Sequence, residues 1–172
     1  MIHKLIAVAA LGLAGSVALL AAGGGPGQGD SRSRAATGTQ RASSLPMRPH
    51  AGPLPALPRV SFEPSRSMAV VQQVYEFAAR HPEVLQYVPC YCGCERVGHS
   101  ANHSCFVKSR AADGRVIEWD SHGIGCAVCI DVARDAMTLF NSGSRPAAIR
   151  EAIDKKYAAS FPSSTPTPRP GR

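Results

Sequence analysis

The sequence has few charged and few aromatic side chains, and it has no internal repeat. Charged residues make up 18% of its 172 residues and aromatic residues 6%, with a single tryptophan. After the N-terminal segment, no apolar run is long enough to span a bilayer. No recognisable nucleic-acid-binding motif is present. The length suits one domain and hardly two, so we expect one small domain without a nucleic-acid partner.

A basic face is also missing from the central part of the chain, although the net charge is +7. The whole excess comes from residues 1–60 and from Arg169 and Arg172 near the C-terminus. Residues 61–163 are balanced near zero, so the folded part lacks the electrostatic footprint of a nucleic-acid-binding protein.

The N-terminus has the layout of a secretory signal. Lys4 precedes an apolar run over residues 5–22, and small residues follow that run. We predict that residues 1–23 are a signal peptide cleaved after Gly23, or an uncleaved N-terminal anchor, because the run is close to the length that spans a bilayer. Either form exports the rest of the chain to the periplasm or another extracytoplasmic compartment, and only an uncleaved N-terminal segment would contact the membrane.

Two further segments are poor in residues that form a packed core. Residues 24–60 are dominated by Pro, Gly, Ser, Ala and Arg, and residues 161–172 are rich in Pro, Ser and Thr. Neither segment shows an apolar period, so we predict a disordered tether and a disordered tail. The folded, Cys/His-rich helical domain is then expected over residues 61–160.

Between these segments, apolar residues recur mainly at helical spacing. The expected helices are one that ends at His81 before Pro82, a short turn over residues 82–88, and longer helices over residues 126–141 and 145–159. The turn signal Asp113-Gly114 between two short apolar segments predicts a short β-hairpin. The predicted fold class is mainly α: a small domain of about four helices with a Cys-rich central loop.

Four of the six cysteines and two of the six histidines lie in the stretch PCYCGCERVGHSANHSC, residues 89–105. Cys90, Cys92 and Cys94 alternate, so their sulfurs point to one side of an extended segment. Gly93 permits a tight turn that lets the three sulfurs converge. The stretch therefore predicts one side of a thiolate site.

A second group of candidate ligands lies at the start of the helix predicted over residues 126–141. Cys126 and Cys129 share one helical face, and the positive end of the helix favours thiolate over thiol. His122 comes just ahead, with Asp120 available to orient its ring. The predicted metal ligands are Cys90, Cys92, Cys94, Cys126 and Cys129, with Cys105, His99, His103 and His122 as auxiliary ligands.

Thiolates combined with imidazoles are the ligands that soft or borderline metal ions prefer. Alternating cysteines fit poorly with the paired Cys-x-x-Cys knuckles of structural zinc sites. We therefore expect Cu(I) as the favoured ion, followed by Zn(II) or a toxic thiophilic metal. No strong arrangement of general acid, base or nucleophile suggests turnover, so the expected function is not enzymatic. It is sequestration of the ion, or its delivery to another extracytoplasmic metal-handling protein.

Two alternatives remain open. In an exported chain six cysteines ordinarily form a disulfide scaffold, with fifteen pairings to choose from, and such a domain would serve as an interaction module. Alternatively, Cys126 and Cys129 form a Cys-x-x-Cys pair at a helix start, which suits a thiol-disulfide redox or maturation factor. The strand before the pair and the later proline loop, both usual in such enzymes, are missing from the pattern.

The segments PCYCGC, SCFVKS and WDSHGIGCAVCIDVA closely resemble the bacterial family named for its PCYCGC motif, described as PCYCGC motif-containing lipoproteins. The resemblance covers residues 68–157. It implies an extracytoplasmic location and a metal-binding set of cysteines and histidines, without an assigned activity. Members that are lipoproteins carry a cysteine at the end of the signal, whereas LLAAGGG in this chain has none. We therefore expect no lipid anchor here.

Overall fold

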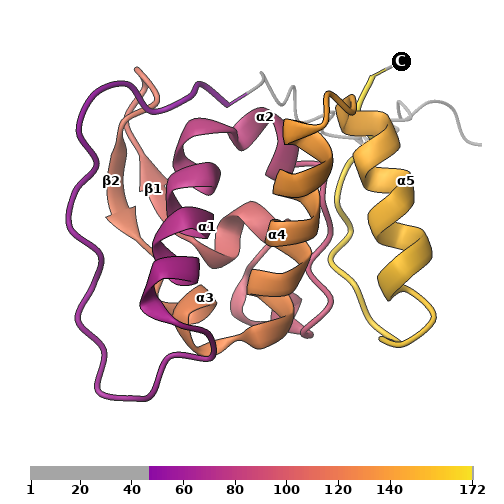
Figure 1. The fold of residues 1–172 in the computed structure, drawn as a ribbon, viewed down its shortest axis with the longest axis horizontal. Coiled ribbons are helices and arrows are strands. Elements are labelled where there is room, and N and C mark those ends of the chain that lie inside the picture. The colour runs from indigo at the N-terminus through magenta and orange to yellow at the C-terminus, as the bar shows by residue number, and fades with distance from the viewer. Residues whose placement is uncertain (1–46, 172) are drawn as a thin grey trace, which may run out of the picture. The chain divides into compact units, whose positions relative to one another are not determined.

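A computed structural model of the chain describes residues 47–171. With η marking a 3₁₀ helix, the elements are α1 (Met68–Arg80), α2 (Pro82–Leu85), η1 (Cys94–Val97), η2 (Asn102–Cys105), β1 (Val107–Arg110), β2 (Val116–Trp119), α3 (His122–Gly125), α4 (Ala127–Asn141) and α5 (Pro146–Tyr157). Figure 1 shows the hairpin of β1 and β2 beside α1, and α5 beyond α4.

Helices dominate the described residues, and the two strands form one small antiparallel sheet. The predicted fold class, mainly α with a short hairpin, is confirmed. The signal peptide or anchor predicted over residues 1–23, and residues 24–46 of the predicted tether, lie outside the described residues. Between residues 47 and 171, no helix combines the length and the apolar content that crossing a membrane requires.

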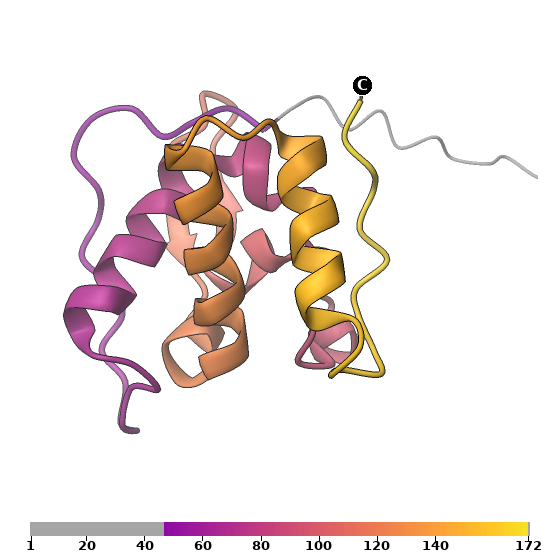
Figure 2. The same cartoon turned by 45° about the vertical axis from the view of Figure 1, so that its right-hand side comes forward.

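The helix α4 lies between the other two long helices. It packs against α1 on one side and α5 on the other, and Figure 2 shows α4 and α5 side by side. Its buried residues keep the helical period, and they are Cys129, Ile130, Val132, Ala133 and Ala136. Because this face begins with Cys129, the packing that buries the helix also fixes the position of that sulfur.

The hairpin forms at the predicted turn. β1 pairs with β2 in antiparallel register, with Val107 opposite Trp119. Gly114 in the turn has φ of +94°, a conformation that glycine adopts without strain. A Cβ at this position would lie 2.6 Å from the carbonyl oxygen of Pro49, so the turn also needs glycine for the close approach of another segment.

That other segment is residues 47–60, which we call the N-terminal strap. It was predicted as part of the disordered tether, and the structure corrects this prediction. The N–H of His50 donates to the Ala79 carbonyl (2.9 Å), and its Nδ1 accepts from the N–H of Val116 (2.8 Å). The Trp119 indole N–H donates to the Pro55 carbonyl (3.1 Å). Its backbone and the ring of His50 thus hold the strap against the end of α1 and the hairpin.

The C-terminal strap, residues 161–171, likewise corrects the predicted disordered tail for the part that the structure describes. Thr165 brackets one cysteine, because its N–H donates to the Cys90 carbonyl (3.0 Å) and its Oγ1 accepts from the Cys90 N–H (2.9 Å). Arg150 of α5 donates to the carbonyl of Thr167 (3.3 Å). These contacts dock the strap beside α5, against the loop that carries the PCYCGC motif.

Candidate metal centre

The loop after α2 carries the first three cysteines. Gly93 has φ of +77°, and this left-handed residue turns the chain into η1 between Cys92 and Cys94. The backbone of Cys90 is held by the two hydrogen bonds from Thr165 described above. A glycine turn and a strap together therefore place the three sulfurs within 4.8 Å of one another, as the alternating spacing predicts.

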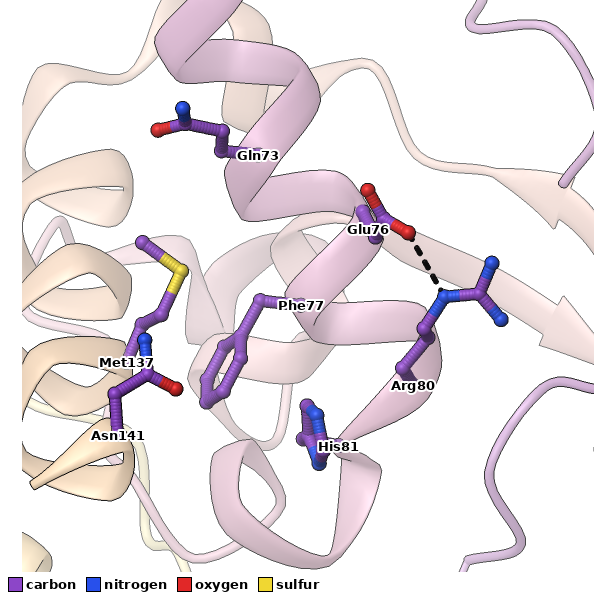
Figure 3. Close-up of a pocket in the computed structure, with 7 residues that line it drawn as sticks. All are labelled: Gln73, Glu76, Phe77, Arg80, His81, Met137 and Asn141. Carbon is purple, nitrogen blue, oxygen red and sulfur yellow. Dashed lines mark hydrogen bonds and ion pairs between the residues drawn. The ribbon is translucent and has the colours of Figure 1, made fainter.

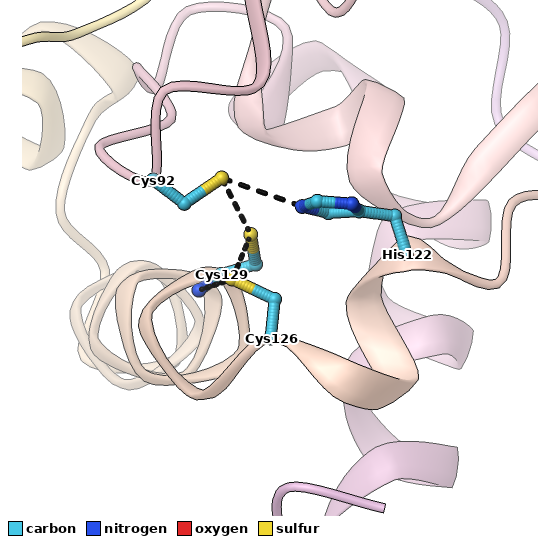
Figure 4. Close-up of side chains that lie close together, drawn as sticks. All are labelled: Cys92, His122, Cys126 and Cys129. Carbon is cyan, nitrogen blue, oxygen red and sulfur yellow. Dashed lines mark hydrogen bonds between the residues drawn. The ribbon is translucent and has the colours of Figure 1, made fainter. Parts of the chain in front are cut away.

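The other side of the centre is the start of α4. Cys126 is the N-cap of this helix, and its Sγ accepts from the backbone N–H of Cys129 (3.4 Å). The two sulfurs of this pair lie 2.8 Å apart. His122 opens α3, directly before α4, and its Nε2 lies 3.3 Å from the Sγ of Cys92. Figure 4 shows these four side chains directed toward one point.

Cys90 lies in the middle of the sulfur cluster. Its Sγ is 3.2 Å from that of Cys92, 3.4 Å from that of Cys105 and 3.5 Å from that of Cys129. All six cysteines are free thiols in the structure. Since three sulfurs are almost equally close to Cys90, no single disulfide partner stands out for it.

The described residues contain two groups of four donors, and we name them by their exposure. The outer group is Cys92, His122, Cys126 and Cys129, of which only Cys129 is buried. The inner group is Cys94, His99, Cys105 and the shared His122, and both of its cysteines are buried. Within each group the ligand atoms all lie within 4.8 Å of one another.

These distances fit a metal ion. Zinc–sulfur bonds of about 2.3 Å in a tetrahedron place sulfurs ~3.8 Å apart, and trigonal thiolate sites have similar spacings. Cys94 and Cys105 already lie 3.8 Å apart. The closer pair of Cys126 and Cys129 would separate by about 1 Å in such a tetrahedron, a movement within reach of one side-chain rotation at the partly buried Cys126.

His99 is oriented for a metal by a carboxylate. Its Nδ1 lies 3.5 Å from the Sγ of Cys105, and its Nε2 lies 3.4 Å from Oδ2 of Asp120. Metal-binding histidines commonly contact a carboxylate through the second ring nitrogen. Asp120 was expected to orient the ring of His122, but its carboxylate accepts a hydrogen bond only from the backbone N–H of that residue (2.8 Å). Tyr75 in turn donates a hydrogen bond to the backbone carbonyl of Asp120 (2.7 Å), which helps to hold Asp120 beside the two histidines.

His103 does not join the cluster, and the prediction of it as an auxiliary ligand is corrected. Its Nε2 accepts hydrogen bonds from the guanidinium of Arg110 (3.1 and 3.3 Å). Burial, together with the charge of Arg110, lowers the pKa of His103 to about 3. Consecutive residues of a 3₁₀ helix are about 120° apart, so two residues in η2 separated by one position point to different sides. His103 therefore faces Arg110 while Cys105 faces the sulfurs.

The thiols share their protons unevenly. The hydrogen bond from Cys105, and to a smaller extent the one from Cys129, lower the pKa of Cys90 to about 7. The pKa of Cys105 is raised well above its usual value, first because its thiol donates to Cys129. Hydrogen bonds to Cys126 and Cys92 raise the pKa of His122 to about 10. The shifts favour a thiolate at Cys90 and a protonated ring at His122, and a bound cation would replace the proton of that ring.

A cavity elsewhere on the domain offers no comparable chemistry. It has a volume of about 300 Å³ and lies between α1 and α4, lined by Phe77, Arg80 and Met137 among others (Figure 3). Glu76 and Arg80 pair with each other across one turn of α1 (2.9 Å). The charged side chains drawn there are therefore already satisfied, and the sulfur cluster remains the candidate site.

The segment of the chain that carries the cluster matches a known protein family. A family model described as a protein of unknown function with PCYCGC motif matches residues 52–170. The chain belongs to the PCYCGC family. Neither a curated protein nor a solved structure matches the chain. The family match includes both straps for most of their length, in agreement with their packing against the PCYCGC domain.

Proposed function

We propose that this PCYCGC protein is an extracytoplasmic binding protein for a soft metal ion, with Cu(I) favoured. The observation that carries the proposal is the convergence of all six cysteines with His99 and His122 on one cluster. Buried thiolates require a compensating cation, and thiolates with imidazoles select soft or borderline ions. Sulfur outnumbers nitrogen six to two in this donor set, which favours Cu(I).

Zn(II) is the second candidate, because the outer group offers three thiolates and one imidazole, a set typical of structural zinc sites. Toxic thiophilic ions follow for the same reason of softness. The export of the chain rests on the sequence of residues 1–23. The role is sequestration or delivery, and it involves no turnover of a substrate.

Metal and thiol content test this proposal directly. The chain is isolated anaerobically from its own compartment, and thiols are counted by alkylation together with elemental analysis. We expect metal-protected thiols, and uptake of Cu(I) in competition with a chelator of known affinity. His103→Gln is the matched control, because it changes a histidine next to the cluster that contacts Arg110 instead. Six oxidised cysteines with no uptake after reduction would refute metal binding.

A second candidate function is thiol-disulfide exchange at Cys126 and Cys129. It is favoured by their 2.8 Å separation at the start of α4. In that reaction the Cys126 thiolate attacks a partner disulfide, and Cys129 then releases the partner as a dithiol while the pair becomes a disulfide. Cys129→Ser would trap the mixed disulfide through Cys126. If no such adduct forms in the native compartment, this candidate is rejected.

A further inference from the structure

The cluster contains more donors than one ion can bind. Six thiolates and the imidazoles of His99 and His122 give eight donor residues. A tetrahedral ion takes four ligands, and Cu(I) commonly takes fewer. One ion in the outer group would leave Cys94 and Cys105 as unused buried thiols beside an oriented histidine, which is a second ligand set.

Cys90 belongs to neither group of four, yet it lies between them. Its Sγ is within 4.8 Å of Cys92 and Cys129 of the outer group, and of Cys94 and Cys105 of the inner group. We propose that the centre holds two metal ions, one in each group, joined by the Sγ of Cys90 as a bridging thiolate. This inference rests on the proposed function.

The chemistry of the donors favours Cys90 as the bridge. A thiolate sulfur has several lone pairs and can bind two ions at once. His122 is also common to both groups, but an imidazole bridges only after losing both ring protons. Cys90 is fully buried, and its backbone is held on both sides by Thr165, so its sulfur stays between the two groups.

The bridge also completes the ligand count. With His122 bound to the outer ion, the inner group offers Cys94, Cys105 and His99, and Cys90, which lies close to both of these sulfurs, would be its fourth ligand. The outer group has four ligands of its own, so an outer ion that shares Cys90 needs only three of them and still has four when Cys90 is lost. The two ions therefore differ in a testable way: the inner ion depends on Cys90, whereas the outer ion keeps four ligands without it.

Cadmium NMR tests the bridge on the full chain. ¹¹³Cd(II) takes tetrahedral thiolate and imidazole ligands, and two cadmium ions on one sulfur show scalar coupling to each other. The reduced chain is titrated anaerobically with ¹¹³Cd(II). We expect two resonances, present together at saturation with two ions per chain, and a resolved coupling between them. A single ion at saturation, three or more ions, or two resonances without coupling would each overturn the bridged pair.

Two variants test the role of Cys90 as the bridge. Cys90→Ser should lose the coupling and one ion, while the outer resonance persists. His103→Gln is the control variant, because His103 contacts Arg110 outside the cluster, and it should keep two coupled resonances. Circular dichroism of both reduced variants confirms that they are folded. If the unmodified reduced chain takes up no cadmium, copper or zinc, the proposed function fails as well, whereas one tightly bound ion leaves that function standing and refutes only the pair.

Discussion

A substitution at Gly123 tests how the fold positions the centre. Gly123 lies in the single turn of α3, next to a candidate ligand. A Cβ there would lie 2.5 Å from the ring of the fully buried Phe106 and 2.8 Å from the Cys105 carbonyl oxygen. In the same turn, a Cβ at Gly125 would meet only the ring of Phe62 (3.0 Å), which is 46% exposed and free to rotate away. Gly123→Ala and Gly125→Ala are thus a matched pair.

The expected difference in the free energy of unfolding follows from what differs between the two variants. Both gain the backbone preference of alanine over glycine in a helix, about 0.8–1 kcal/mol, and this gain cancels in the comparison. Only Gly123→Ala overpacks a buried ring and a backbone carbonyl, which costs about 1–3 kcal/mol. We expect Gly125→Ala to be neutral or slightly stabilising, and Gly123→Ala to be less stable than it by about 2 kcal/mol.

Urea denaturation of the reduced, metal-free chains measures this difference. With a slope of about 2 kcal/mol per M, the two midpoints should differ by about 1 M. Gly123→Ala should also shift His122 away from Cys92 and weaken metal binding by about tenfold, the lower end of the loss seen when the support of a ligand is disturbed. Equal midpoints and equal affinities for the two variants would refute this account of α3.

Three further predictions concern the ligands and their support. Thr165→Val removes the hydroxyl that accepts a hydrogen bond from the buried N–H of Cys90. The free energy of unfolding, measured in urea, should fall by about 1–3 kcal/mol. An unchanged midpoint would contradict the docking of the C-terminal strap. His99→Gln should weaken metal binding, whereas His103→Gln should leave the metal-to-protein ratio unchanged; competition titrations decide, and equal losses would return His103 to the ligand set. The pKa of His122 is raised to about 10, so its ring must lose a proton to bind a metal ion. The apparent metal affinity should therefore rise from pH 6 to pH 8, and His122→Gln should make this rise smaller. If the rise is the same in His122→Gln, His122 is not a ligand.

The apolar period of the sequence was sufficient to predict α1, α2, α4 and α5, but not α3 or the two 3₁₀ helices, and the Asp-Gly turn was sufficient to predict the hairpin. The straps were not predictable in this way, because extended Pro-rich backbone has no period to detect. Long-range hydrogen bonds, such as that from the Trp119 indole to the Pro55 carbonyl, help to hold them in place. A carbonyl oxygen carries no signature in the sequence, so composition alone indicated disorder where the structure has a docked segment.

The candidate site was predictable in its cysteines more than in its histidines. Alternation in the motif and the pair at the start of α4 each constrain sulfur geometry locally. The choice between His99 and His103 depends instead on η2, whose three-residue turn directs His103 toward Arg110. Asp120 contacts both His99 and His122, and only the tertiary arrangement shows that its carboxylate meets the ring of His99 but the backbone N–H of His122.

The two ligand groups differ in exposure, and this difference bears on how the protein would use its metal. Cys92, Cys126 and His122 of the outer group are only partly buried, so a competing ligand from another protein can reach an ion there. Cys94 and Cys105 of the inner group are buried within the hydrophobic core. An ion held by those sulfurs exchanges only when packed core residues move, which makes exchange slow. In a bridged pair, the inner ion would therefore hold the cluster together, and the outer ion would be the one delivered.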